Sequence, residues 1–203
     1  MTDSKSKSGT KSGFNRRDFL RGSGAAAAAT ALQAQTAAAL QQKEGQTVVR
    51  GEQTITLNVN GKDETVKAEP RTTLLEVLRY QLDLTGCKPV CPHGSAGTST
   101  VFIDGKPMEA ATTLAVAAVG KKIQTAESLG GARPDPVVKA FVENDAQQCG
   151  FCTPGFVMAV RAFLNKNPQA TEEQIRSGLN GNLCRCGTYA NIIPAAIAVA
   201  KGG

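Results

Sequence analysis

Four cysteines in the C-terminal half constrain this chain more than any other feature. Cys149 and Cys152 stand in a C-x2-C spacing, and Cys184 and Cys186 follow in a C-x-C spacing. The first spacing lets two sulfurs point into one concavity where a loop enters a helix, and the second forms a tight clip from another loop. Soft thiolates grouped in this way are typical of a soft metal centre. Because no histidine lies nearby, they fit either structural zinc or an iron–sulfur cluster.

Disulfides are the alternative to metal binding. The chain contains six cysteines, enough for three bridges in an exported protein. Cys184 and Cys186 are too close in sequence to form an ordinary bridge with each other, so each would need a distant partner. The sequence therefore favours metal for the four C-terminal cysteines and leaves a disulfide between Cys87 and Cys91 open.

The distribution of charge argues against nucleic acid as a partner. The formal net charge of the 203 residues is +6. Residues 1–21 hold six Lys or Arg and two Asp, a net +4, which leaves only +2 for the remainder. No basic stripe is interleaved with aromatic residues, as a nucleic-acid surface would require. We therefore expect no binding to nucleic acid.

Residues 1–40 are predicted to be a tail and an export signal. The twin arginine Arg16-Arg17 precedes Phe19-Leu20 and an alanine-rich run, a pattern typical of a twin-arginine signal. A basic helical tail or a membrane anchor is the alternative. Gln33 and Gln35 interrupt the apolar run, so we expect no stable membrane span after signal removal. The protein should be periplasmic or otherwise exported, and this route carries proteins that have already folded around their cofactors.

Residues 52–126 are predicted to form a β-rich domain. Residues 53–59 alternate apolar and polar side chains as a half-buried strand does. Asn60-Gly61 predicts a hairpin turn into a strand over 64–68, and helical spacing predicts a helix over 74–82. The other expected elements are a Gly-rich loop over 86–99, strands over 100–103 and 106–109, a short helical stretch near 112–118 and a strand over 122–125. Strands wrapped on one helix with a long loop match a β-grasp ferredoxin-like domain.

Residues 135–201 are predicted to form a domain of four helices, after a Gly-rich linker over 127–134. The expected helices cover 137–143, 154–164, a segment that begins with the capping box at 171–174, and 189–201. Four helices around two facing loops would bring the cysteine pairs together. The fold class is thus α+β.

The sequence around the cysteines resembles a known family. Gln148-Cys149-Gly150-Phe151-Cys152-Thr153-Pro154-Gly155, together with Asn182-Leu183-Cys184-Arg185-Cys186 and Tyr189, is similar to the small iron–sulfur subunit of molybdenum hydroxylases. That family includes xanthine dehydrogenase, carbon monoxide dehydrogenase and periplasmic aldehyde oxidoreductase, and with its export signal the chain most resembles the iron–sulfur subunit of the last. Zinc does not explain the neighbours of the cysteines. One departure is Gly187-Thr188, where the family has Thr-Gly.

The resemblance implies an electron-transfer subunit. Cys149, Cys152, Cys184 and Cys186 would bind one [2Fe-2S] cluster in the four-helix domain, and Gln148 and Cys186 would contact the molybdopterin bound by a large molybdenum-binding subunit. Electrons would pass to a flavin subunit or a cytochrome acceptor. No residue of this chain is implied as a general base or nucleophile, so it would be the non-catalytic subunit of an oxidoreductase. A zinc- or disulfide-stabilised scaffold without redox activity is the rival interpretation.

The family's first domain binds a plant-type [2Fe-2S] cluster, and the matching loop here lacks most ligands. Cys91 occupies the first ligand position, whereas the other three fall at Ala96, Ser99 and Ala111. Cys87, Cys91 and His93 offer three soft donors from one loop but no fourth ligand across from it. We therefore expect the plant-type cluster to be absent and the β-rich domain to fold without it. Ala and Ser are near-isosteric with Cys, so both a natural and an engineered origin stay open.

Overall fold

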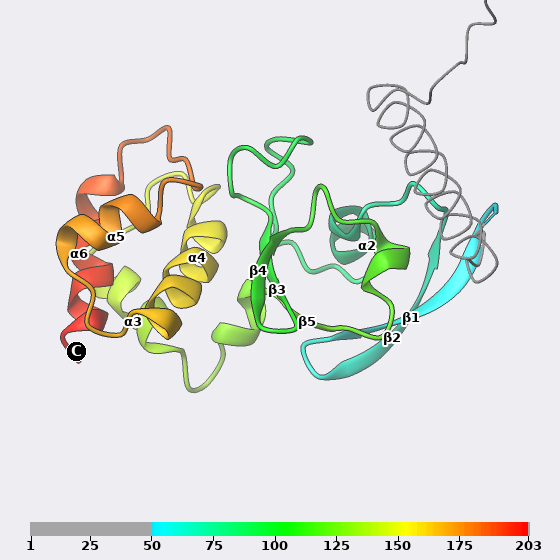
Figure 1. Ribbon diagram of the computed structural model, residues 1–203, viewed down its shortest axis with the longest axis horizontal. Coiled ribbons are helices and arrows are strands. Elements are labelled where there is room, and N and C mark those ends of the chain that lie inside the picture. The colour runs from blue at the N-terminus through cyan, green and yellow to red at the C-terminus, as the bar shows by residue number, and fades with distance from the viewer. Residues whose placement is uncertain (1–49, 203) are drawn as a thin grey trace, which may run out of the picture. The chain divides into compact units, whose positions relative to one another are not determined.

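The computed structural model describes residues 50–202, and the predicted tail and signal at 1–40 lie outside the described residues. The described chain is of the α+β class, with one five-stranded mixed sheet and five α-helices (Figure 1). The class predicted from the sequence is confirmed. No helix of residues 50–202 is long and apolar enough to cross a membrane.

The hairpin of β1 (Gln53–Val59) and β2 (Lys62–Ala68) forms where the turn signal predicts it. Asn60 and Gly61 have φ of 52° and 81°, the left-handed pair that a type I′ turn requires. Leu57 and Val59 are buried on one face of β1, and Thr56 and Asn58 are more exposed, as the alternation predicts. The second strand begins two residues earlier than expected because the tight turn pairs Val59 with Lys62.

Three further strands complete the sheet in the order β2-β1-β5-β3-β4. They are β3 (Thr100–Ile103), β4 (Lys106–Glu109) and β5 (Lys122–Gln124). The last strand runs parallel to β1 and antiparallel to β3, so the sheet is mixed. Because β5 lies between β1 and β3, all five strands form one sheet, and this sheet borders the buried core of the β-rich half.

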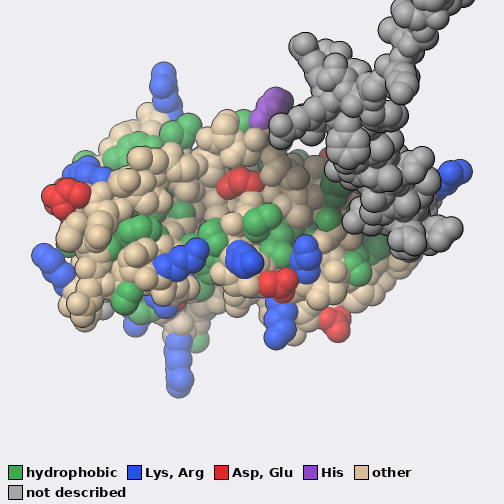
Figure 2. Space-filling model, viewed as in Figure 1, with side chains coloured by type: hydrophobic (Ala, Val, Ile, Leu, Met, Phe, Trp, Pro, Cys, Tyr) green, Lys and Arg blue, Asp and Glu red, His purple; other side chains and the backbone are tan. Residues whose placement is uncertain are grey.

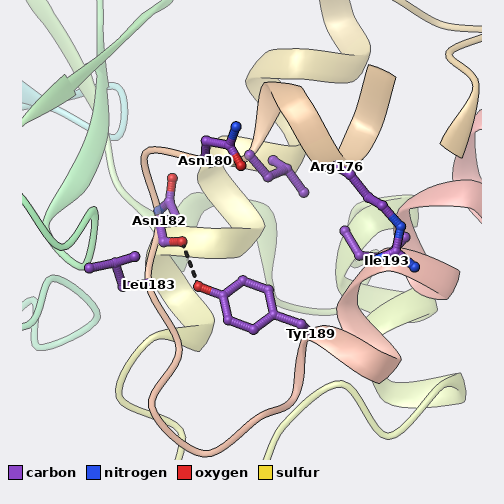
Figure 3. Close-up of a pocket in the computed structure, with 7 residues that line it drawn as sticks. Arg176, Asn180, Asn182, Leu183, Tyr189 and Ile193 are labelled. Atoms are coloured by element: carbon purple, nitrogen blue, oxygen red, sulfur yellow. Dashed lines mark hydrogen bonds between the residues drawn. The ribbon is translucent and has the colours of Figure 1, made fainter. Parts of the chain in front are cut away.

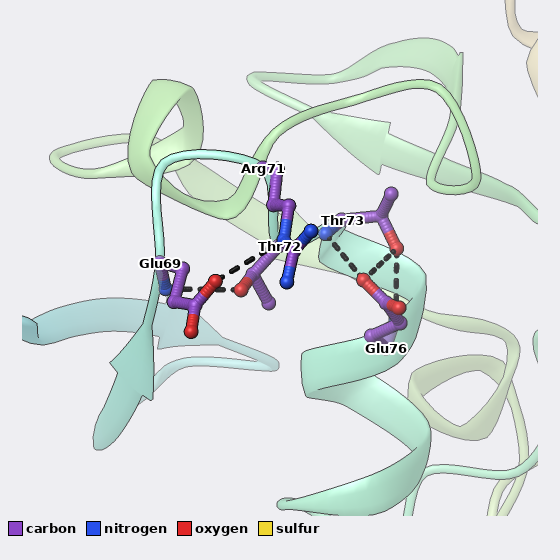
Figure 4. A network of polar contacts seen from close by, with 5 residues as sticks. All are labelled: Glu69, Arg71, Thr72, Thr73 and Glu76. Atoms are coloured by element: carbon purple, nitrogen blue, oxygen red, sulfur yellow. Dashed lines mark hydrogen bonds and ion pairs between the residues drawn. The ribbon is translucent and has the colours of Figure 1, made fainter. Parts of the chain in front are cut away.

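Helix α2 (Leu74–Tyr80) covers this core with four buried residues, Leu74, Leu75, Val77 and Leu78. Its first turn is fixed by a capping box in which Thr73 and Glu76 exchange hydrogen bonds, as Figure 4 shows. The helix ends at Tyr80 rather than at residue 82. Gln81 instead turns to the backbone of Lys67 on β2, accepting at 3.0 Å and donating at 2.8 Å.

Helices α3 (Pro136–Glu143), α4 (Thr153–Lys166), α5 (Glu172–Gly178) and α6 (Tyr189–Ala200) form the C-terminal half. The predicted capping box at the start of α5 is present, with Thr171 accepting from the Gln174 N–H and Gln174 accepting in return. A second buried core lies among these helices, and its largest fully buried members are Phe156, Ile175, Ile192, Val137 and Val160.

The segment predicted as a linker is partly ordered as a 3-10 helix, η2 (Ala126–Leu129). The Glu127 carboxylate accepts from the N–H of Gly86 at 2.7 Å, and Leu129 packs against the helical core. The stretch predicted as helical near 112–118 is the 3-10 helix η1 (Ala115–Ala118). Short turns of this kind form through local contacts that periodicity does not reveal.

The two cores meet through α4 and β3. Phe102 of β3 packs with Met158 and Ala162 of α4 in a third small buried cluster. At the start of α4, Gly155 lies so close to the loop before β3 that an added Cβ would overlap the carbonyl oxygen of Gly97. Residues 50–202 belong to one compact unit by their contacts, so the division into domains at 52–126 and 135–201 stays a prediction.

We predict that Gly155→Ala lowers the free energy of unfolding by about 1–3 kcal/mol, because the new methyl group meets backbone that cannot rotate away. Thermal unfolding of the full chain, followed by circular dichroism, measures the effect. Gly181→Ala is the matched control, since a Cβ there meets nothing within 4 Å. Equal stability of the two variants would contradict the close packing of α4 against the loop.

Candidate metal centre

The C-x2-C pair lies at the start of α4. Cys152 is the N-cap residue of this helix and is buried, whereas Cys149, in the loop before it, is exposed. Thr153 and Pro154 form the first helical positions, where the missing N–H of proline costs no hydrogen bond. The helix thus begins directly after the C-x2-C motif.

The C-x-C pair lies in the loop between α5 and α6, and Tyr189 fixes this loop. The Tyr189 hydroxyl accepts from the N–H of Cys184 at 2.9 Å. It also donates to the carbonyl of Asn182 at 3.0 Å, the contact drawn in Figure 3. The Tyr189 ring packs edge-on against Phe156 of α4, with centroids 5.6 Å apart. Tyr189 belonged to the predicted motif, and the structure gives it a physical role.

The two loops face each other. Cys149 is close enough to Cys186 for the two thiols to affect each other's pKa, and the same holds for Cys152 and Cys184. Within residues 50–202, no three His, Cys, Asp or Glu side chains form a ready metal-binding group. The structure therefore brings the four predicted cysteines together as two neighbouring pairs rather than as a closed set of four.

One thiol of each pair has a lowered pKa. Burial opposes ionisation of Cys184, but hydrogen bonds with Thr188, whose hydroxyl lies 2.8 Å from the sulfur, lower its pKa to about 7. Its partner Cys152 has a pKa raised to about 12 by burial and by the hydrogen bond with Cys184. In the exposed pair, the backbone N–H of Phe151 and then Cys186 lower the pKa of Cys149, and that same pairing raises the pKa of Cys186. Each pair thus contains one sulfur inclined to be a thiolate, the form that binds metal.

All six cysteines of the described residues are free, so neither the four paired thiols nor Cys87 and Cys91 form a disulfide in this structure. Cys87 is buried in the core of the β-rich half, while Cys91 is partly exposed and its sulfur lies 3.0 Å from the hydroxyl of Ser95. Cys87, Cys91 and His93 do not converge as a metal-binding group within the described part of the chain.

The three positions without ligands are buried. Ala96 and Ala111 are apolar and carry no donor atom. Ser99 donates to the Glu109 carboxylate at 2.6 Å. The Ser99 oxygen also accepts from the N–H of Ala111 at 3.1 Å, which joins two of the family's ligand positions directly. Cys91 and Ala111 line a pocket of about 370 Å³ beside α2.

Each of the two cysteine loops carries an exposed apolar side chain. Phe151 is 54% and Leu183 is 55% exposed, next to the exposed Cys149 and Cys186. Gln148, singled out from the sequence, is exposed on the same loop as Cys149. Exposed apolar residues gathered at a site are typical of a protein contact surface. The sequence analysis assigned no role to Phe151 or Leu183. An apolar residue in a cysteine loop, where no hydrophobic core can bury it, is the sequence signal for such a contact surface.

Charge does not gather in the same way. On the face of the molecule shown in Figure 2, Lys and Arg side chains are scattered, and some of them lie beside Asp or Glu side chains. Lys88 lies over the Phe151 ring, 5.8 Å from its centroid, so this cation is engaged with an aromatic face.

Comparisons with known proteins identify both the cysteine half and the signal. Residues 125–197 match a family described as [2Fe-2S] binding domain, and residues 13–32 match a TAT (twin-arginine translocation) pathway signal sequence. The predicted export by the twin-arginine route is therefore confirmed. The first match spans all four paired cysteines, which agrees with an iron–sulfur rather than a zinc site.

Relatives and solved structures agree with this match. The nicotine 6-hydroxylase small subunit of Paenarthrobacter nicotinovorans is 41% identical over 143 residues, which cover 70% of this chain and 87% of that protein. The aldehyde oxidoreductase iron-sulfur-binding subunit PaoA of Escherichia coli O157:H7 is 38% identical over 200 residues, 90% of this chain and 86% of that protein. The crystal structure of quinoline 2-oxidoreductase from Pseudomonas putida 86 has a chain with a TM-score of 0.69 and 39% identity, covering 75% of this chain and 98% of that chain.

We predict that Cys91 is alkylated readily near neutral pH and that Cys87 is not. Hydrogen bonds, first from Ser95, lower the pKa of Cys91 from 9.0 to about 7, whereas burial raises the pKa of Cys87 to about 12. Because the thiolate is the reactive form, the Cys91 rate should rise up to about pH 7 and then level off. Mass spectrometry after timed iodoacetamide treatment measures both sites. Ser95→Ala should move the Cys91 profile to higher pH, and an unchanged profile in this variant would contradict the assigned cause.

Proposed function

Because this chain belongs to the family of small iron–sulfur subunits of molybdenum hydroxylases, we propose that it is the electron-transfer subunit of an exported molybdenum-dependent hydroxylase. The enzyme would oxidise an aldehyde or a heterocycle on a large molybdenum-binding partner subunit. The observation that carries the proposal is that two facing loops place Cys149 near Cys186 and Cys152 near Cys184, inside the segment that matches a [2Fe-2S] binding domain.

The four cysteines fit a [2Fe-2S] cluster by the chemistry of their donors. They supply four soft sulfurs from two loops, all free, with one sulfur of each pair already inclined to ionise. Neutral donors around them support the ionised form, above all the Phe151 N–H at Cys149 and the Thr188 hydroxyl at Cys184. When bound, the cluster would take up and release one electron at a time.

The residues of the chain hold and tune this site. Cys152, buried at the start of α4, keeps water from one side, and the α4 backbone presents its N-terminal dipole to the sulfurs. Tyr189 holds the Cys184 backbone and makes no contact with its sulfur, which is hydrogen-bonded to Thr188. Hydrogen bonds, burial and solvent exposure of this kind are what set the potential of an iron–sulfur centre.

The exposed side of the site is the proposed contact with the large subunit. Gln148 and Cys186 would reach the molybdopterin held by that subunit, and Phe151 and Leu183 would be buried by it. Exposed aromatic and aliphatic side chains next to a redox site lose their water when a partner covers them, which favours binding and shields the centre.

The N-terminal half would serve as a β-grasp domain without its own cluster. The mixed sheet order with α2 packed on it supports this fold. Ala96 and Ala111 offer no donor atom, and the Ser99 hydroxyl is engaged with Glu109. Electrons would therefore leave from the single cluster to a flavin subunit or a cytochrome that docks nearby.

We predict about two irons per chain and one reduced-cluster signal in electron paramagnetic resonance of the purified full chain. Cys184→Ser should lose most of the iron, because a hard alkoxide replaces a thiolate ligand. Cys91→Ser is the matched control and should keep it. About four irons with two distinct signals, or loss of iron in Cys91→Ser, would contradict the one-cluster proposal. Zinc in place of iron would contradict the redox function as a whole.

A further inference from the structure

The loop over residues 91–99, which we call the emptied loop, is in direct contact with the cysteine site. The side-chain amide of Asn182 donates to the carbonyl of Gly97 at 2.7 Å, in a buried hydrogen bond between residues 85 apart in sequence. The N–H of Leu183 donates to the carbonyl of Ala96 at 3.0 Å. Asn182 and Leu183 are the two residues that directly precede Cys184, so the emptied loop holds the segment of chain that leads into the C-x-C pair.

The contact is a close approach of backbones. Gly97 has a φ of +68°, and a Cβ there would lie 2.5 Å from the Asn182 amide nitrogen and 2.6 Å from the carbonyl oxygen of Gly181. On its other side, the Gly97 carbonyl meets Gly155 of α4, where a Cβ would overlap it. The emptied loop therefore lies between the segment that follows Cys152 and the segment that precedes Cys184.

Hydrogen bonds hold the emptied loop in place without a metal. The Thr100 hydroxyl shares its hydrogen between the Gly97 carbonyl and the Glu109 carboxylate, each at 2.7 Å. The second oxygen of Glu109 accepts from Ser99 at 2.6 Å. Lys88 and Thr98 add a backbone bond of 3.0 Å and a hydroxyl bond of 3.1 Å. The carbonyl that receives Asn182 is thus tied to β4 through one hydroxyl and one carboxylate.

Segment 182–184 is held from two sides. On one side the Tyr189 hydroxyl binds the Asn182 carbonyl and the Cys184 N–H, as Figure 3 shows for the first of these contacts. On the other side the Asn182 side chain and the Leu183 N–H reach the emptied loop. With three backbone groups and one side chain fixed, the Cα–Cβ direction of Cys184 has little freedom.

We propose that the emptied loop is a positioning element for Cys184, with Asn182 as the positioning residue that transmits its placement. The inference rests on the proposed function, because it assigns the loop a role toward the cluster that Cys184 would bind. It gives the loop a function that needs none of the missing ligands. Its consequence is that changes in the β-rich half alter the spectroscopic signature and the iron retention of a site built from the helical half.

The test uses the iron-loaded full chain and three variants. Asn182→Ala removes the donor to Gly97, and Thr100→Val removes the hydroxyl that braces the Gly97 carbonyl while keeping the side-chain shape. Asn167→Ala is the matched control, because Asn167 also donates its amide to a backbone carbonyl, that of Phe163 at 3.1 Å, but does so at the exposed end of α4. The readouts are the g-values of the reduced protein and the rate at which a chelator removes iron.

Asn182→Ala should shift the g-values and release iron roughly tenfold faster, the scale of effect that outer contacts have on metal sites. Thr100→Val should change both in the same direction by less, and Asn167→Ala should match the unaltered chain. Unaltered g-values and iron release in Asn182→Ala, or an equal change in Asn167→Ala, would overturn the positioning role and leave the proposed function standing. An unaltered chain that holds no iron would overturn both. Far-ultraviolet circular dichroism shows whether Asn182→Ala folds. If it does not, the g-values and the iron release of Thr100→Val test the positioning role instead.

Discussion

The Tyr189 hydroxyl makes the contact on which the rest of the cysteine site depends. By accepting from the Cys184 N–H and donating to the Asn182 carbonyl, it closes the C-x-C loop into a fixed turn. The same ring packs edge-on against Phe156, one turn into the helix that begins at Cys152. One side chain therefore links both cysteine segments to the helical core. Because Phe156 is fully buried, any shift of one segment relative to the other disturbs core packing, which makes the separation of the two loops a property of the fold.

Local physics explains how much of this could be predicted from the sequence. The Asn60-Gly61 turn, the Thr171 capping box and the apolar period of α4 are short-range features, and the structure forms each where expected. The pattern of the four cysteines predicted that they meet. The unequal pKa values of neighbouring cysteines depend on burial and on Thr188, which no spacing encodes. The 3-10 helix η2 in the predicted linker is ordered by Glu127 reaching 41 residues back to Gly86, and that contact has no local signal either.

The contacts of the emptied loop could not be predicted from the sequence either. The residues Ala96, Ser99 and Ala111, set against a ligand pattern, predict what is missing, which is donor atoms for a metal. They do not predict the backbone hydrogen bonds that the loop makes to the segment before Cys184. The carbonyls of Ala96 and Gly97 belong to the backbone, so their hydrogen bonds to Leu183 and Asn182 do not depend on which side chains stand at the ligand positions. Only the glycine at 97, which allows the backbones to approach, leaves a trace in the sequence.

Ser99 shows how hydrogen bonds can hold the loop in shape. A buried hydroxyl without a partner costs about 1–3 kcal/mol, and this one has two partners, the Glu109 carboxylate and the Ala111 N–H. Glu109 in turn accepts from Thr100, which braces the carbonyl that receives Asn182. A chain of polar contacts thus runs from two of the family's ligand positions to the residues beside Cys184. Under the proposed positioning role, the β-rich half would matter to the cysteine site through these hydrogen bonds, none of which involves a metal ligand.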